Sequence, residues 1–114
     1  MAQLTTGLID NPAVAGVRPT ASLAVQLAND DTTTATVLIE GFYMSGATKI
    51  MYVQEPISIA AGNVATRSYY AQLAAVEFQF TTSSEAVEIS VWGKDAAGNL
   101  VAAHRACPAE LNTF

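Results

Sequence analysis

The 114 residues are enough for one domain with a single hydrophobic core. Charged residues make up only 13% of the chain and apolar residues 51%, a balance that leaves apolar surface for another protein to bury. Ten acidic residues against five scattered basic ones (Arg18, Lys49, Arg67, Lys94 and Arg105) give a net charge of −5, which argues against nucleic-acid binding and against an anionic membrane surface.

Residues 1–20 differ from the rest of the chain. Gly7, Pro12, Gly16 and Pro19 rule out a helix of any length. A flexible leader and an extended arm that docks on a neighbouring subunit both remain open, and the aliphatic content favours the arm. Its candidate anchors are Leu4, Leu8, Ile9, Val14 and Val17.

From residue 20 onward the pattern is that of β-strands separated by turns. Pro56 is expected to bend the chain between the third and fourth strands, and residues 71–75 are the one place for a single helical turn. Eight strands are predicted, at residues 22–27, 33–44, 49–53, 57–59, 64–72, 76–81, 87–92 and 100–106.

The clearest alternation of apolar and polar residues lies in the sixth and seventh predicted strands. It points Val76, Phe78 and Phe80 inward in the sixth, and Val87, Ile89 and Val91 inward in the seventh. Trp92 then falls on the outward face. We expect an all-β fold, an antiparallel jelly roll or β-sandwich of about eight strands (residues 21–114) with an extended N-terminal arm (residues 1–20).

Chemistry-bearing residues are few. His104, the only histidine, lies three positions before Cys107, the only cysteine, and residues three apart on a strand point to opposite faces. These two residues do not make a zinc site alone, and whether Asp30 and Asp31 bind a metal is left open. We therefore expect that the protein is not an enzyme and that it has no catalytic residue and no cofactor.

A lone cysteine excludes an intramolecular disulfide, so Cys107 is either a free thiol or bonded to another chain. No apolar stretch approaches the length of a membrane span, and Asp10 and Pro12 interrupt the only apolar run near the start. We expect an extracellular location, or one on the cell or spore surface, reached without a cleaved signal peptide.

Three aromatic residues, Tyr69, Tyr70 and Trp92, lie on predicted strands with some of their rings facing outward. Exposed rings anchor protein interfaces and also stack on sugars, while in the simplest case they cover the edge of a core. The sequence leaves these three roles open.

Residues 88–105 read EISVWGKDAAGNLVAAHR and are followed by Ala109, Glu110 and Leu111. This ending resembles that of small all-β proteins from spore-forming Firmicutes. The layout of the whole chain is similar to endospore appendage subunits, and this resemblance implies an N-terminal connector before a jelly roll that stacks into extracellular fibres. Those connectors carry crosslinking cysteines, whereas residues 1–20 here contain none.

Together these features predict a structural subunit that assembles with itself into an extracellular filament or surface layer, through its arm and its sheet edges. Two alternatives remain: a carbohydrate-binding module that takes a polysaccharide, and a phage or capsid decoration protein. The predicted assembly residues are Leu4, Leu8, Ile9, Val14, Val17, Tyr69, Tyr70 and Trp92.

Overall fold

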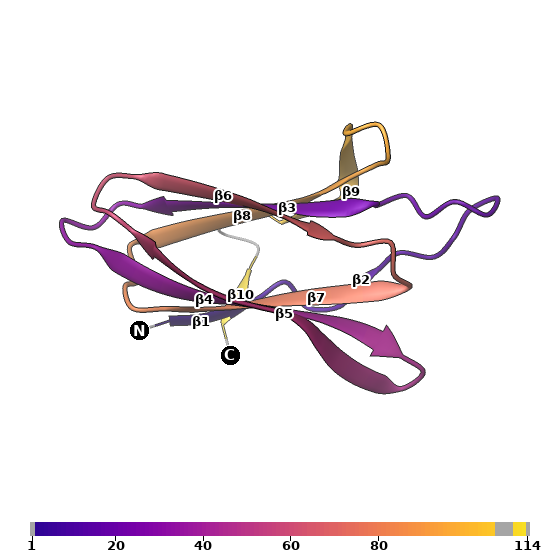
Figure 1. Ribbon diagram of the computed structural model, residues 1–114, viewed down its shortest axis with the longest axis horizontal. Helices are drawn as coiled ribbons and strands as arrows, with labels where there is room; N and C mark the ends of the chain where they lie inside the picture. The colour runs from indigo at the N-terminus through magenta and orange to yellow at the C-terminus, as the bar shows by residue number, and fades with distance from the viewer. Residues whose placement is uncertain (1, 107–110, 114) are drawn as a thin grey trace.

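Two antiparallel sheets pack face to face as a β-sandwich in the computed structural model, which describes residues 2–106 and 111–113 (Figure 1). The prediction of an all-β sandwich is confirmed. The strands are β1 (Ala2–Thr5), β2 (Ile9–Asp10), β3 (Ser22–Asn29), β4 (Ala35–Ser45), β5 (Thr48–Ile59), β6 (Val64–Tyr70), β7 (Ala75–Thr82), β8 (Val87–Lys94), β9 (Leu100–Ala106) and β10 (Asn112–Thr113).

The larger sheet has the order β10-β1-β7-β4-β5, and β2 pairs with β7 beyond the end of β1. The smaller sheet has the order β6-β3-β8-β9. The described residues contain no helix, so the helical turn considered at residues 71–75 is not formed. Accordingly, no helix in this part of the chain is long and apolar enough to cross a membrane.

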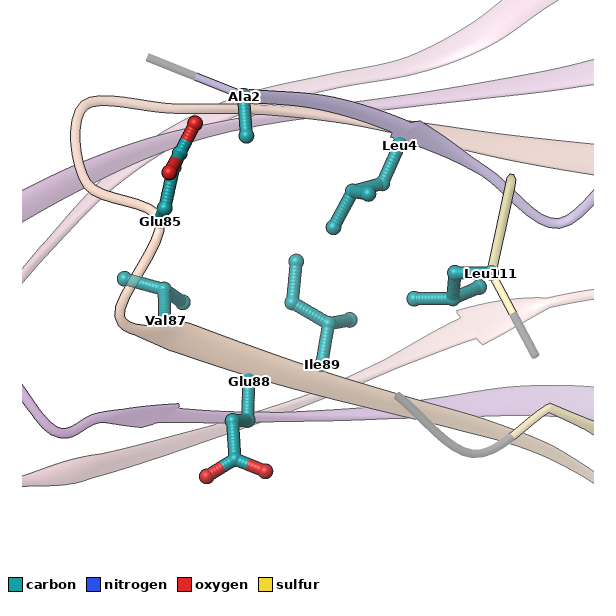
Figure 2. A pocket seen from close by; sticks show the side chains of 7 residues that line it. All are labelled: Ala2, Leu4, Glu85, Val87, Glu88, Ile89 and Leu111. Carbon is teal, nitrogen blue, oxygen red and sulfur yellow. The ribbon is translucent and has the colours of Figure 1, made fainter. Parts of the chain in front are cut away.

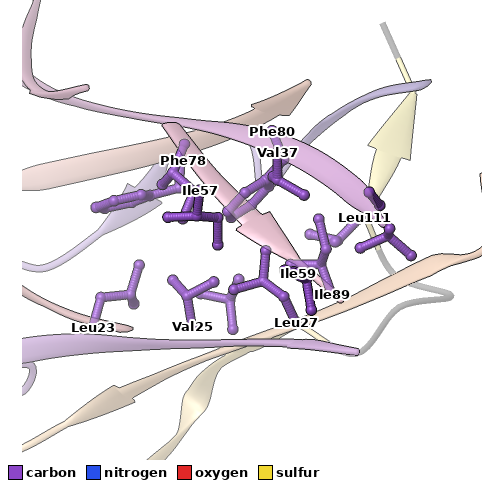
Figure 3. Close-up of a cluster of buried hydrophobic side chains, with 14 of the residues drawn as sticks. Leu23, Val25, Leu27, Val37, Ile57, Ile59, Phe78, Phe80, Ile89 and Leu111 are labelled. Atoms are coloured by element: carbon purple, nitrogen blue, oxygen red, sulfur yellow. The ribbon is translucent and has the colours of Figure 1, made fainter. Parts of the chain in front are cut away.

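The core lies between the two sheets and consists of the inward-facing residues of the long strands (Figure 3). The inward direction predicted for Val76, Phe78 and Phe80 is confirmed, since each is at most 1% exposed. The inward direction of Val87, Ile89 and Val91 is confirmed as well, at 5%, 1% and 0% exposed. Further core side chains are Leu23, Val25, Leu27, Val37, Ile39, Ile57, Ile59 and Leu111.

The predicted break at Pro56 is wrong, because residues 48–59 form one continuous strand, β5. This strand is at the edge of its sheet and pairs only with β4, where Pro56 lies opposite Leu38. Proline lacks an N–H donor, which disrupts a central strand but is tolerated at an edge. The ladder shifts register beside Gly41, and the β4–β5 hairpin extends beyond the sandwich (Figure 1).

The N-terminal arm pairs with its own domain. Strand β1 lies between β7 and β10, with Leu4 opposite Phe80, and Ile9 of β2 lies opposite Val76. Leu4 and Ile9, predicted to dock on a neighbouring subunit, here pack against the core of their own chain. A strand tethered to its acceptor has a higher effective concentration than the same strand of a separate molecule, which favours this pairing.

Candidate functional site

The two ends of the sandwich differ in character, and we name them by their contents. The tip end carries the β4–β5 and β8–β9 turns and the link between β2 and β3, which projects beyond the sheets (Figure 1). The acidic end carries the connections at residues 30–34, 60–63 and 83–86. They lie at opposite ends of a molecule 48 Å long.

Exposed apolar side chains gather toward the tip end. Of the eight large apolar residues that are exposed among the described residues, six lie in this half. Val14 and Val17 are the most open, at 65% each, followed by Tyr70 at 61%. The other three are Ile50, Met51 and Leu100. Soluble domains seldom gather such residues unless they bind something there.

The projecting link ends in a tight two-residue hairpin, which we call the tip hairpin (residues 14–17). Val14 and Val17 exchange both backbone hydrogen bonds, at 2.7 and 3.0 Å. The residues between them, Ala15 and Gly16, have φ angles of 51° and 80°. Two successive positive φ angles define the type I′ turn that suits β-hairpins. The turn leaves both valine side chains open to solvent, each at 65% exposed.

A buried asparagine holds the base of this hairpin. The Asn11 amide, which is 0% exposed, donates hydrogen bonds to the carbonyls of Thr20 (2.8 Å) and Ala71 (2.9 Å). Its side-chain oxygen accepts a bond from the Thr20 N–H (3.0 Å), and the Arg18 guanidinium donates to the Asn11 carbonyl (2.8 Å). The tip hairpin is therefore mounted on a fixed base rather than on a loose loop.

The predicted aromatic residues do not share one surface. Tyr69 points inward, stacks on Phe78 at 5.2 Å between ring centroids, and donates a hydrogen bond to Glu55. Trp92 is half-buried on the outer face, directly opposite Ala24, which is only 1% exposed. Of the three, only Tyr70 presents an open ring.

An ion pair and two tyrosines tie the sheets together along the β5–β6 edge. Arg67 Nε lies 2.9 Å from Glu55 Oε2, and the hydrogen bonds from Tyr69 and Arg67 lower the pKa of Glu55. Burial raises the pKa of Tyr69, and the neighbouring Glu55 raises it further. Tyr52 donates a 2.6 Å bond to the Tyr70 carbonyl, and burial raises its pKa to about 12. Both phenols therefore stay protonated and serve as donors at neutral pH.

The acidic end carries Asp30, Asp31, Glu85 and Glu88, and none of the four basic side chains that the structure describes (Arg18, Lys49, Arg67 and Lys94) lies there. A hydrogen bond from Ser84 lowers the pKa of Asp31. Glu88 shares a hydrogen bond with Asp30 and is repelled by its charge, which raises the pKa of Glu88. Within residues 2–106 and 111–113, no group of three or more His, Cys, Asp or Glu side chains could hold a metal ion.

A cleft of about 310 Å³ opens between the sheets near the acidic end. Figure 2 shows Leu4 of β1, Ile89 of β8 and Leu111 pointing into the same space from different parts of the chain. Val87 also lines the cleft, and exposed Glu85 lies beside Ala2 at its rim, whereas Glu88 points away (Figure 2). The interior is thus aliphatic and the rim is acidic.

His104 has a packing role in the described part of the chain. Its Nδ1 forms a hydrogen bond with the Thr20 hydroxyl beside Gly93. A Cβ built on Gly93 would overlap Thr20 and touch the Cβ of His104, so glycine permits this close approach. Cys107, which the sequence placed near His104, lies outside the described residues.

No protein-family model matches this sequence, and no curated protein matches it. Two solved structures are similar to the sandwich. One is the Anabaena sensory rhodopsin transducer, with a TM-score of 0.52 and 10% identity, over 77% of this chain and 90% of that chain. The other is the Thermotoga maritima protein 1070, with a TM-score of 0.54 and 10% identity, over 99% of this chain and 90% of that chain.

The likeness is one of fold. At 10% identity the two structures support the sandwich architecture. They do not identify a functional site or a binding partner for this chain. The names of these two proteins do not refer to a spore appendage, so the resemblance to appendage subunits remains a prediction.

Sequence reasoning identified Val14 and Val17 but missed the turn between them and the asparagine beneath it. An Ala-Gly pair between two valines was the available signal for a two-residue hairpin. No local sequence pattern indicates the cleft, because Leu4, Ile89 and Leu111 lie far apart along the chain.

Proposed function

We propose that this protein is a non-catalytic structural subunit that associates with copies of itself through the two ends of its sandwich. The supporting observation is the gathering of six exposed apolar residues toward the tip end, opposite an end that carries four carboxylates. An extracellular filament or surface layer, on the cell or spore surface, belongs to the same proposal.

The charges favour contacts between unlike ends. Two acidic ends repel each other, because four carboxylates on each would meet and no basic side chain among the described residues lies there to compensate. The tip end is balanced in charge, with Arg18 and Lys94 against Asp10 and Asp95, and with Lys49 paired to Glu77. A contact between the tip end of one copy and the acidic end of the next is heterologous. Repeating such a contact gives a filament unless the rotation between copies closes a ring.

Strands β1 and β2 of the arm take a smaller part in this proposal than the sequence alone suggested. Because β1 and β2 pair with β7 in their own sheet, deleting residues 1–20 would expose the β7 edge and remove Asn11. Such a deletion therefore changes folding as well as any contact between subunits. Point substitutions of exposed residues test the proposal more cleanly.

The carbohydrate-binding alternative draws less support. A sugar platform needs several open rings on one face, and here Tyr69 is inward, Trp92 is half-buried and Tyr70 stands alone. The phage-decoration alternative has no feature of its own among the described residues that separates it from self-assembly.

Sedimentation velocity over a range of concentrations, together with negative-stain electron microscopy, tests the proposal. We expect species larger than the monomer, in an amount that rises with protein concentration. The proposal would be overturned if the protein remained monomeric at every concentration up to about 1 mM, because such measurements would detect association with a dissociation constant at or below that value.

A further inference from the structure

The tip hairpin and the cleft have complementary shapes and charges. The hairpin offers two valine side chains, each 65% exposed, followed at once by the positive charge of Arg18. The cleft offers about 310 Å³ lined by aliphatic side chains, with the carboxylate of Glu85 at its rim. This volume is at the small end of the range for ligand pockets and suits an isopropyl group or two.

The tip hairpin of a chain does not reach the cleft of the same chain. The tip hairpin lies at one end of a molecule 48 Å long and the cleft lies near the other end. Asn11 also holds the hairpin base against Thr20 and Ala71, so the hairpin does not swing back. Any tip that enters the cleft therefore belongs to another molecule.

The geometry points to a specific head-to-tail joint, in which the tip hairpin of one copy inserts Val14 and Val17 into the cleft of the next. This inference rests on the proposed self-association and names its contact. Arg18 of the first copy then pairs with Glu85 of the second. The guanidinium has five N–H donors, so its bond to the Asn11 carbonyl leaves others for the carboxylate.

Matched substitutions of exposed apolar residues test the role of the tip hairpin in association. In Val17→Asp a charge replaces an apolar side chain that is open to solvent in the monomer, so the fold is retained while the joint is lost. We expect sedimentation velocity to give a dissociation constant at least about tenfold higher, the factor that matches the burial of one valine. Leu8→Asp is the control, since Leu8 is 52% exposed between β1 and β2 and belongs neither to the tip hairpin nor to the lining of the cleft.

A charge exchange tests the pairing. Arg18→Glu and Glu85→Lys should each weaken association, and one chain that carries both substitutions should regain it, because the opposite charges then meet again. Thermal unfolding checks that each variant folds.

Mixing variants tests the head-to-tail sense. Val17→Asp chains keep an intact cleft and Glu85→Lys chains keep an intact tip, so each alone should be impaired, while their mixture forms a 1:1 dimer that grows no further.

The outcomes separate the two proposals. A wild-type protein that stays monomeric overturns both. A wild type that associates, with Val17→Asp and both charge variants equal to it, leaves self-association standing and overturns this joint. An equal loss in Leu8→Asp and Val17→Asp also overturns it, because the effect would then be general to exposed apolar residues.

Discussion

The Tyr69 hydroxyl donates a 2.7 Å hydrogen bond to the Glu55 carboxylate and so joins the two sheets at the edge formed by β5 and β6. Nothing in the alternation of residues 64–72 distinguishes this tyrosine from Tyr70, its neighbour on the opposite face. The bond closes one open side of the sandwich without a covering strand.

Tyr69→Phe should keep the stacking on Phe78 and lose the hydrogen bond to Glu55. The Glu55 side chain is 37% exposed, so water replaces part of the lost interaction. We expect chemical denaturation to give a free energy of unfolding lower by about 1 kcal/mol. An unchanged value would contradict a role for this bond in joining the sheets. Tyr70→Phe is the control, since Tyr70 makes only a long 3.5 Å bond to a nearby carbonyl.

Acid should destabilise the fold through Glu77. Burial of this carboxylate raises its pKa, but hydrogen bonds from Lys49, Thr5 and Gln79 outweigh burial and leave the pKa below its ordinary value of 4.5. A lowered folded pKa gives stability that is present above the unfolded pKa and is lost as the pH falls through the folded one.

Lys49→Met removes the charged donor to Glu77 and tests this dependence. The variant should be less stable than the wild type at pH 7, and the difference between them should shrink as the pH falls below about 4.5. Unfolding curves measured from pH 7 to pH 2.5 check it. A difference that stays constant over this range would mean that Lys49 acts through packing on Phe42, over whose ring it lies at 5.4 Å, and not through Glu77.

Asn11→Ala should be among the most damaging single substitutions. It leaves the Thr20 N–H and the carbonyls of Thr20 and Ala71 without their buried partner, which costs about 3 kcal/mol. It should also loosen the tip hairpin, so that hydrogen exchange at residues 14–17 becomes faster. Exchange that remains as slow as in the wild type would contradict the role of Asn11 as a fixed base. Asn63→Ala, in an exposed turn, is the control.

Gly41→Ala should destabilise the sandwich through overpacking. A Cβ at this position would lie 2.8 Å from the Phe78 ring and 2.9 Å from the Val53 Cβ. Phe78 is fully buried and has no space to move, so we expect thermal and chemical unfolding to show a loss of about 1–3 kcal/mol. Gly46→Ala is a useful comparison, because a Cβ there meets nothing within 4 Å and only its φ of 62° is unfavourable. An unchanged stability of Gly41→Ala would contradict a close contact between this position and Phe78.

The strands that alternate strictly were predictable, because inward and outward positions such as Phe78 and Gln79 follow from the two-residue period of a half-buried strand. Pro56 was misjudged because its effect depends on whether β5 is central or at an edge, which is a property of strand order. The pairing of β1 with β7 could not be predicted for a similar reason, since Leu4 and Phe80 lie opposite each other in the sheet but far apart in the sequence.

The candidate site was only half visible. Val14 and Val17 could be proposed because apolar residues in a proline- and glycine-rich segment need a partner. The cleft could not, because its walls come from β1, β8 and Leu111, and only the packing of two sheets brings them together.

The pairing of β1 with β7 also sets the order of events on the ribosome. The β4–β5 hairpin can close as soon as residue 59 has emerged, whereas β1 must wait for β7, which is made much later. Every nascent chain therefore passes through an interval in which Leu4 and Ile9 have no acceptor. When β7 does appear, its edge is open to the first matching strand that reaches it.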